Sequence, residues 1–323
     1  MGLWDLFSRT PASGFGSSST AEQVTEGIDA TGLTAIVTGA TSGIGKETAR
    51  VLALRGANVI IPSRNLESGL KMKEALLKEQ PNAKLEVMEL DLASINSLTS
   101  FARSFNSSHQ RLNILINNAA IMGCPFQLSK DGIELQFATN HLGHFLLTNL
   151  LLDKLKATSK STGIEGRIVN VSSIAHRYAK ASTLIGLDTI NDSSKYKPIV
   201  AYGRSKLANI LHANELSKQL QEEGANVTAN SLHPGFIPTN ITRYTQLRAN
   251  LLMLLLKPFA KSIAQGASTT CYVSLHPNLN GVTGKYFANC NEKQPSSQAR
   301  DKDVGGKLWD FSQDLIKKLN NPK

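Results

Sequence analysis

The sequence is short of cysteine, of aromatic residues and of long apolar runs. Its three cysteines, Cys124, Cys271 and Cys290, are too few and too scattered for a disulfide framework or a metal knuckle. Together with the lack of a secretory leader, they favour a reducing, intracellular compartment. The run Leu251–Leu256 falls far short of the ~18–20 residues of a membrane helix. We therefore expect at most peripheral membrane contact, and no metal, because the seven histidines show no ligand spacing.

Acidic residues are also in the minority. The 323-residue chain has 35 Lys and Arg against 25 Asp and Glu, a formal net charge of +10. This excess of positive charge favours anionic binding partners such as a phosphorylated cofactor or an acidic lipid surface. The lysines are scattered and lack a stacked-aromatic motif, so we expect no nucleic-acid partner. A hydrophobic share of 41% excludes a fully disordered or collagen-like chain.

From residue 33 onward, short apolar runs alternate with longer amphipathic stretches. This alternation predicts βαβ units, and so a single-domain α/β fold: a Rossmann-type, doubly wound parallel sheet with helices on both faces. The predicted strands are Leu33–Val37, Ala57–Ile61, Lys84–Leu90, Ile114–Ile116, Arg167–Val171 and Asn226–Leu232. The predicted helices are Lys46–Leu54, Leu66–Glu79, Ile95–Phe105, Gly132–Leu155 and Tyr202–Leu220.

Two flanking segments stand apart from the predicted domain at residues 32–300. Residues 1–31 carry a Ser- and Gly-rich cluster that is compatible with a plastid transit peptide. The alternative, which we favour, is a strap laid over the body and anchored by Leu3, Trp4 and Phe7.

Residues 301–323 are predicted to form a C-terminal amphipathic helix. Its apolar side chains at Leu308, Phe311, Leu315 and Leu319 share one face. Such a helix can bind calmodulin, another partner or a membrane surface. We favour packing against its own domain.

A glycine-rich turn joins the first predicted strand to the first helix. It reads Thr38-Gly-Ala-Thr-Ser-Gly-Ile-Gly45. Glycines at such a place permit a tight turn and close approach of the backbone to a diphosphate, which then lies on a helix N-terminus. A plain glycine-rich turn is the alternative.

Three side chains further along the chain suggest acid–base chemistry. Tyr202 and Lys206 are four residues apart, so one helix face presents both. A nearby lysine cation would lower the pKa of a tyrosine toward the working range of an acid–base catalyst. Ser173 ends a predicted strand at the carboxyl edge, where its hydroxyl can donate to a substrate oxygen. Strand alternation would turn its competitor, Ser172, the other way.

Together these features resemble the short-chain dehydrogenases/reductases over roughly residues 33–290. Within that family the chain resembles the retinol-dehydrogenase-like branch, and most closely the plant Tic-translocon-associated members. Five separated motifs carry the resemblance in the right order: Thr38–Gly45, Asn117-Asn118-Ala119-Ala120, Ser173, Tyr202–Lys206 and Pro234-Gly235.

The resemblance implies roles for individual residues. Tyr202 is the proton donor, Lys206 also binds the nicotinamide ribose, and Ser173 rather than Ser172 polarises the carbonyl. Asn140 matches an asparagine that holds a relay water, with a buried structural asparagine as the alternative. The implied cofactor-binding residues are Gly39, Ser42, Gly43, Ile44, Gly45, Arg64, Asp91, Leu92, Asn118, Ala119, Tyr202, Lys206, Pro234, Gly235 and Thr239.

The end of the second predicted strand indicates which coenzyme is used. An NAD site usually has an acidic residue there, whereas this chain has Ser63 and Arg64. A guanidinium suits a 2′-phosphate, so we expect NADP(H), with Lys46 as a weaker second contact. Two departures stand out. Ala120 replaces the family's glycine, and Pro62 is awkward in an internal strand, which we therefore expect to stop there.

The sequence leaves the substrate and the setting open. An apolar lid at about residues 236–264 suggests a bulky apolar ketone, aldehyde or alcohol, although its leucines can equally serve packing. The leading hypothesis is an NADP(H)-dependent oxidoreductase that reduces such a carbonyl. The alternative is a nucleotide-sensing regulatory or interaction protein at the chloroplast envelope with little turnover. A homo-oligomer, and a cytoplasmic or chloroplast location, stay open.

Overall fold

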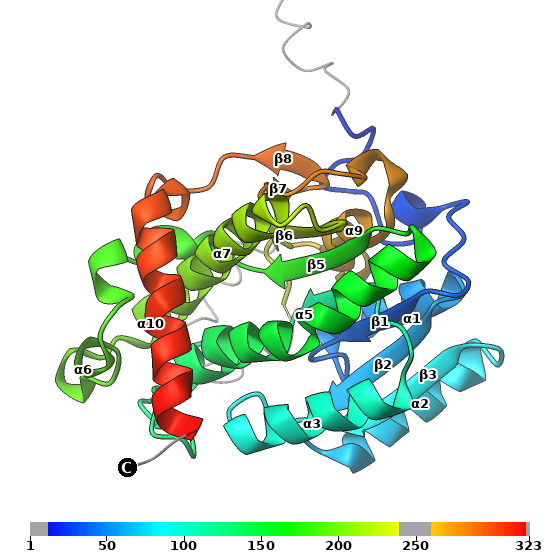
Figure 1. Cartoon of the computed structure of the whole chain (residues 1–323). Coiled ribbons are helices and arrows are strands. Elements are labelled where there is room, and N and C mark those ends of the chain that lie inside the picture. Colours follow the sequence, from blue (N-terminus) through cyan, green and yellow to red (C-terminus); the bar gives the residue numbers. More distant parts are fainter. Residues whose placement is uncertain (1–11, 239–259, 321–323) are drawn as a thin grey trace, which may run out of the picture.

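The computed structural model describes residues 12–238 and 260–320. At its centre is a twisted sheet with the strand order β3-β2-β1-β4-β5-β6-β7-β8 (Figure 1). Neighbouring strands are parallel from β3 to β7, and β8 pairs antiparallel with β7. The strands are β1 Thr34–Val37, β2 Asn58–Ser63, β3 Lys84–Glu89, β4 Ile114–Asn117, β5 Gly166–Val171, β6 Val227–His233, β7 Tyr286–Ala288 and β8 Asn291–Lys293.

Helices cover both faces of the sheet, as predicted. The helices are α1 Gly43–Leu54, α2 Leu66–Glu79, α3 Ile95–Ser108, α4 Leu135–Phe137, α5 Gly143–Thr162, α6 Leu187–Ile190, α7 Pro198–Glu222, α9 Ile263–Leu275 and α10 Lys302–Asn320. Capping residues in the sequence fix several of the helix ends. Asn65 and Ser94 accept backbone N–H bonds at the starts of α2 and α3, and Gly163, in a left-handed conformation, ends α5.

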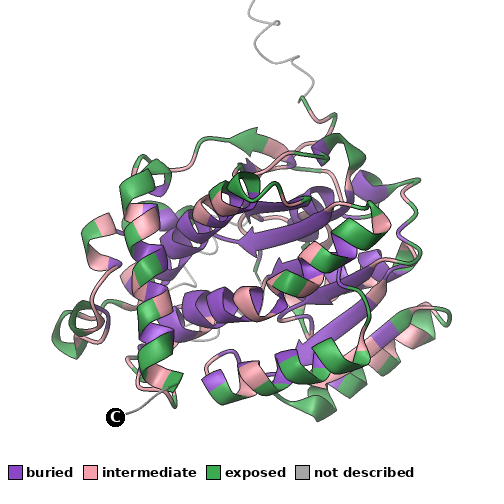
Figure 2. Cartoon of the chain, viewed as in Figure 1, coloured by how far each residue is buried: buried purple, intermediate pink, exposed green. Residues whose placement is uncertain are grey.

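Alternate residues of each strand enter different cores, because successive side chains point to opposite faces of a sheet. In β1, Ile36 packs with α3, α5, α7 and α10. Its neighbours Ala35 and Val37 pack with α1, α2 and α9. The central strands are therefore buried on both faces (Figure 2), which is why they read as short, continuous apolar runs.

The six predicted strands are all present, with small shifts at their ends. The prediction missed β7 and β8, which have three residues each and too little pattern to detect. It also joined Gly132–Leu155 into one helix. The structure divides this stretch into α4, a π-helical turn at Ala138–Leu142, and α5, which continues to Thr162.

The expectation that β2 stops at Pro62 was wrong, because the strand continues to Ser63. The Asn58 N–H donates toward β1, to the Leu33 carbonyl, so alternate residues, including Pro62, also face β1. The pairing with β1 ends at Ile60. The N–H that proline lacks would therefore point toward Val37, the last residue of β1, beyond the last pair of that ladder.

The described part of the N-terminal segment lies against α9. The Ala21 N–H donates to the Ala264 carbonyl, and the Phe15 ring meets the Tyr272 ring edge-on at 5.8 Å. Ala21, Val24 and Ala30 are buried in the core beneath α1 and α9. Leu3, Trp4 and Phe7, the anchors that we predicted, lie outside the described residues.

The C-terminal helix α10 packs across α7 and the end of α3 (Figure 1). Leu308 and Leu315 are buried, Phe311 and Leu319 are partly buried, and Trp309 joins them against the ring of Phe145 at 4.8 Å. The apolar face of this helix therefore contacts its own domain.

Candidate active site

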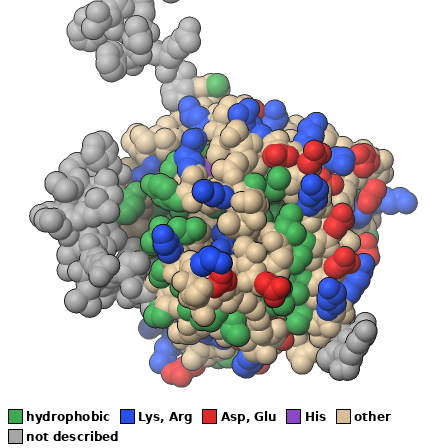
Figure 3. All heavy atoms as spheres, turned by 90° about the vertical axis from the view of Figure 1, so that its left-hand side faces the viewer, with side chains coloured by type: hydrophobic (Ala, Val, Ile, Leu, Met, Phe, Trp, Pro, Cys, Tyr) green, Lys and Arg blue, Asp and Glu red, His purple; other side chains and the backbone are tan. Residues whose placement is uncertain are grey.

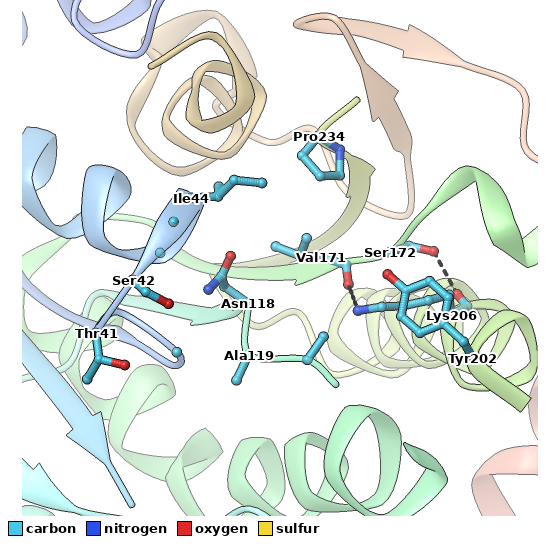
Figure 4. A pocket seen from close by; sticks show the side chains of 14 residues that line it. Thr41, Ser42, Ile44, Asn118, Ala119, Val171, Ser172, Tyr202, Lys206 and Pro234 are labelled. Atoms are coloured by element: carbon cyan, nitrogen blue, oxygen red, sulfur yellow. Dashed lines mark hydrogen bonds between the residues drawn. The ribbon is translucent and has the colours of Figure 1, made fainter. Parts of the chain in front are cut away.

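A cleft lies at the carboxyl edge of the sheet and divides into two adjoining cavities of about 230 and 190 Å³. Both are lined by Gly39, Thr41, Ala119 and Ala120. The larger cavity also brings together most of the predicted coenzyme and catalytic residues (Figure 4): Ser42, Gly43, Ile44, Gly45, Asn118, Tyr202, Lys206 and Pro234. Ala120, which replaces the family's glycine, thus borders both cavities.

The glycine turn leaves the start of α1 open toward this cleft. Ser42 occupies the N-cap position, but its side chain makes no capping hydrogen bond. The first N–H groups of α1 therefore stay available for an anionic ligand. A Cβ on Gly45 would lie 2.4 Å from the Gly39 carbonyl oxygen and 2.5 Å from Nδ2 of Asn118. Close backbone packing, rather than turn flexibility alone, requires glycine here.

Thr38 organises the turn, although we did not predict a role for it. Its Oγ1 accepts the N–H groups of Asn118 and Ala119, both at 2.9 Å, and lies 2.9 Å from Nε2 of His144. Asn118 in turn donates from Nδ2 to the Thr38 carbonyl at 2.7 Å. This network locks β1 to the loop after β4. Its sequence signal was the threonine that directly precedes Gly39.

The smaller cavity lies over the ends of β2 and β3. It is lined by Pro62, Ser63, Arg64, Asp91 and Leu92, so three further predicted coenzyme-binding residues, Arg64, Asp91 and Leu92, meet there. The Arg64 side chain is exposed at its rim. Lys46, the weaker second candidate, lines neither cavity.

Tyr202 and Lys206 lie on one face of α7 and are both buried. The Lys206 Nζ is 5.6 Å from the centre of the Tyr202 ring and donates to the Val171 carbonyl at 2.8 Å (Figure 4). The Val171 acceptor is a backbone atom, so no side-chain pattern could have identified it.

The expectation that Lys206 lowers the pKa of Tyr202 was wrong for this arrangement. Burial raises the pKa of Tyr202 to about 12, and a hydrogen bond with Ser173 only partly offsets this. Burial also lowers the pKa of Lys206 to about 7, because its charged form loses solvation. The site therefore presents a protonated phenol at neutral pH.

The two neighbouring serines point to different places. Ser172 borders the larger cavity, but its hydroxyl donates to the Lys206 carbonyl at 2.7 Å. The Ser173 oxygen accepts the Ala175 N–H at 3.2 Å and bonds with Tyr202. The structure thus places Ser173, and not Ser172, next to the phenol.

Asn140 lies in the π-helical turn and is fully buried. Its side chain bonds both backbone groups of Ile121 at 2.9 Å and donates to Ser205 Oγ at 3.0 Å. All three contacts tie the loop after β4 to α7. The side chain therefore braces the site, and the predicted relay role of Asn140 stays a prediction.

Comparisons with known proteins agree with this geometry. The family model described as "short chain dehydrogenase" matches residues 33–185. The Brassica napus protein "Short-chain dehydrogenase TIC 32 A, chloroplastic" is 57% identical over 307 residues, covering 95% of this chain and 96% of that protein. The chain belongs to the short-chain dehydrogenase/reductase family.

A further relative supports the retinol-dehydrogenase-like branch of this family, and a solved structure supports the fold. Mouse retinol dehydrogenase 12 is 42% identical over 292 residues, covering 90% of this chain and 89% of that protein. A crystal structure of a Mycobacterium paratuberculosis protein superposes with a TM-score of 0.69 at 34% identity, over 91% of this chain and 97% of that one. The predicted family, branch and fold are confirmed.

Members of this family bind a nicotinamide coenzyme, and the cleft fits one. The open N–H groups at the start of α1 and the glycine turn suit the diphosphate of a dinucleotide. The second cavity, over β2, gives room for one of its nucleoside ends. Gly235 follows Pro234 at the far end, with a left-handed φ of 107°. Thr239 and most of the predicted lid lie outside the described residues.

Two features are absent from the described residues. Within residues 12–238 and 260–320, no three His, Cys, Asp or Glu side chains are grouped to hold a metal ion. No helix in that part of the chain is long and apolar enough to cross a membrane.

Proposed function

We propose that the protein is an NADP(H)-dependent oxidoreductase that reduces the carbonyl group of a bulky, apolar small molecule. The observation that carries this proposal is that Tyr202, which bonds with Ser173, and Lys206 line one end of a cleft whose other end suits a dinucleotide. An oxidoreductase is also what membership of the family supports.

The chain's own groups then have distinct tasks. The coenzyme supplies the hydride when it is bound. Tyr202, with its pKa raised to about 12, holds the proton that the carbonyl oxygen requires. Ser173 donates to the same oxygen and stabilises its developing charge. Lys206 contacts the coenzyme ribose and, when protonated, favours the phenolate that Tyr202 leaves behind.

The choice of NADP(H) over NAD(H) rests on Arg64. This side chain is exposed at the rim of the smaller cavity, where its guanidinium can form charge-assisted bonds with a 2′-phosphate. Bonds of this kind are worth about 1.5–3 kcal/mol. We expect Arg64→Ala to weaken NADPH binding about 10- to 100-fold and to leave NADH binding unchanged, as titrated by coenzyme fluorescence. An equal loss for both coenzymes would contradict the assignment.

Apolar surface next to the reacting groups supports an apolar substrate. Ile174 follows Ser173, and Ile199 lies one helical turn before Tyr202; they are 47% and 44% exposed. The arrow of β5 in Figure 1 points to the left, so Figure 3 views this carboxyl edge and shows hydrophobic side chains exposed on it. Several relatives are named retinol dehydrogenases, and the retinol in that name is an apolar alcohol.

The setting that we propose is the chloroplast, with at most peripheral contact with a membrane. The support is the word "chloroplastic" in the names of two relatives at 57% identity. Immunogold labelling or import into isolated plastids tests this location. Exclusive recovery in the cytosol would contradict it.

The decisive test is consumption of NADPH over a panel of bulky ketones and aldehydes. We expect turnover in the wild type and its loss in Tyr202→Phe, which removes only the phenol hydroxyl group. Tyr272→Phe is the matched control, because Tyr272 lies on α9 in the core beneath α1. If NADPH binds but neither carbonyls nor alcohols are turned over, the nucleotide-sensing alternative is the better description.

A further inference from the structure

The peptide group between Ser173 and Ile174 is held from both sides by imidazoles. Its carbonyl oxygen is 2.7 Å from Nδ1 of His176 and also accepts the His176 backbone N–H at 3.1 Å. Its N–H donates to Nδ1 of His233 at 3.2 Å. His176 belongs to the turn Ile174–Tyr178 and His233 ends β6, so two separate elements grip one peptide plane.

The partners fix where the protons lie. A carbonyl only accepts, so Nδ1 of His176 carries the proton and donates it to Ser173. The other nitrogen, Nε2, accepts the Ser296 N–H at 3.1 Å and must be unprotonated. His233 accepts at Nδ1, so that nitrogen is unprotonated too. Both bonds to an accepting nitrogen therefore require a neutral ring.

The surroundings keep both rings neutral. His176 is fully buried and its ring meets Tyr286 edge-on at 5.5 Å. The charged and titratable groups facing the pair are Arg177 beside His176, Lys261 and His176 beside His233, and Tyr286. Burial and the charge of Arg177 lower the pKa of His176, and burial and the charge of Lys261 take that of His233 to about 4.

Ser173 depends on this peptide for its position. Its Oγ accepts the Ala175 N–H within the same turn. That turn sits directly on α7, where a Cβ added to Gly203 would lie 2.5 Å from the Ala175 carbonyl oxygen. Gly203 is the neighbour of Tyr202, so a rotation of the peptide would move Ser173 relative to the phenol.

We propose that His176 and His233 are positioning residues for the reaction and form a histidine clamp that orients the Ser173 hydroxyl through its peptide group. The clamp rests on the proposed function, since it acts on the serine that contacts the substrate oxygen. Misplacing a reacting group by about 1 Å can cost 100-fold in rate. The clamp would keep the Ser173 hydroxyl within that distance of its working position.

Substitutions by leucine and by asparagine distinguish the effect of the histidine hydrogen bonds from the effect of side-chain volume. Leucine removes the polar nitrogen. Asparagine restores a donor near Nδ1 in His176→Asn and an acceptor there in His233→Asn. We expect each leucine variant to lower kcat roughly 10- to 100-fold with the Kd for NADPH unchanged, and each asparagine variant to recover most of the loss.

The Ser173→Ala background provides the sharper readout. If the histidines act through Ser173, His176→Leu and His233→Leu should lower kcat no further in that background. An equal loss in both backgrounds, a parallel loss of NADPH affinity, or an asparagine variant no better than leucine would each overturn the clamp. His212→Asn is the matched control, because this buried histidine on α7 bonds Asn170 and not the Ser173 loop.

An NMR measurement on the wild type tests the clamp without catalysis. Nitrogen-15 spectra should show the Nδ1–H tautomer of His176 at pH 7, and the Ile174 amide shift should move in His233→Asn. An Nε2–H tautomer for His176 would overturn the proposal even if the leucine variants fail to fold. A wild type that turns over nothing refutes the proposed function alone, whereas an active wild type without coupling to Ser173 refutes the clamp alone.

Discussion

The two halves of the cleft are built by different means. The coenzyme half is built on the backbone of the glycine turn: residues 39–45 have no titratable side chain, the N–H groups of α1 stand open, and Gly45 has no room for a methyl group. The catalytic half consists of buried polar side chains with their bonds largely made, among them Lys206 on Val171 and His176 on Ser173.

This difference indicates how each half fails. A site made of backbone is damaged by an added atom, because a close contact has nowhere to move. A site made of buried polar groups is damaged by a removed atom or an added charge, because its partner is left without a bond in a medium of low polarity. Four measurements test this contrast, taken from the largest expected effect to the smallest.

Removing one oxygen should affect the catalytic half most. We expect Ser173→Ala to lower kcat by about 100- to 1,000-fold, as the loss of a donor to a developing oxyanion does elsewhere. Ser172→Ala removes the bond to the Lys206 carbonyl and should cost about 1 kcal/mol of folding free energy with little loss of kcat. Steady-state kinetics and urea unfolding of both variants decide the matter. If Ser172→Ala suffers the larger loss of kcat, the assignment is reversed.

Adding one methyl group should affect the coenzyme half. Gly45→Ala places a Cβ 2.4 Å from the Gly39 carbonyl oxygen. Overpacking of this kind costs roughly 1–3 kcal/mol, so we expect the Kd for NADPH to rise about 10- to 100-fold. Isothermal titration measures it. A variant that binds NADPH as tightly as the wild type would show that the turn is not closely packed.

Acid should act on the buried histidines. Burial lowers the pKa of His144 and His233 to about 4 and that of His212 to about 3, and it holds the pKa of His141 well below its usual value. The unfolded chain binds these protons from pH ~6.5 downward, before the folded chain does. Stability should therefore fall as the pH drops from about 6.5 toward 4, by at most about 1.4 kcal/mol per pH unit for each histidine.

Thermal melts at pH 7.5, 6, 5 and 4.5 measure this slope. Carboxylates also contribute to acid unfolding, so the informative quantity is the difference between the wild type and His212→Asn. The variant should lose less stability over the same range. Identical slopes would show that His212 is not held neutral in the folded chain.

The smallest effect is expected at a glycine that touches nothing. A Cβ on Gly306 in α10 would meet no atom within 4 Å. Alanine is favoured over glycine in a helix by up to about 1 kcal/mol, so Gly306→Ala should raise the midpoint of urea unfolding and leave the Kd for NADPH unchanged. It is the matched control for Gly45→Ala. A destabilised Gly306→Ala would show that the space around α10 is occupied.

Much of the architecture could be predicted from the sequence, because its signals are local. Both faces of the central strands are buried, so they appear as apolar runs, and the glycine turn and the four-residue interval between Tyr202 and Lys206 are short-range patterns. The retention of Pro62 within β2 was not predictable, since it depends on where a different strand, β1, ends.

The sequence by itself determined the order of strands and helices, the turn at Thr38–Gly45 and which residue types reach the carboxyl edge. Only the tertiary structure decided the electrostatics and the orientation of the catalytic half. The pKa of Tyr202, the Val171 acceptor for Lys206 and the bond from the Ile174 N–H to His233 all arise between segments far apart in the chain. The physical reason is that burial and hydrogen bonding are properties of the packed interior, and no single segment carries its surroundings with it.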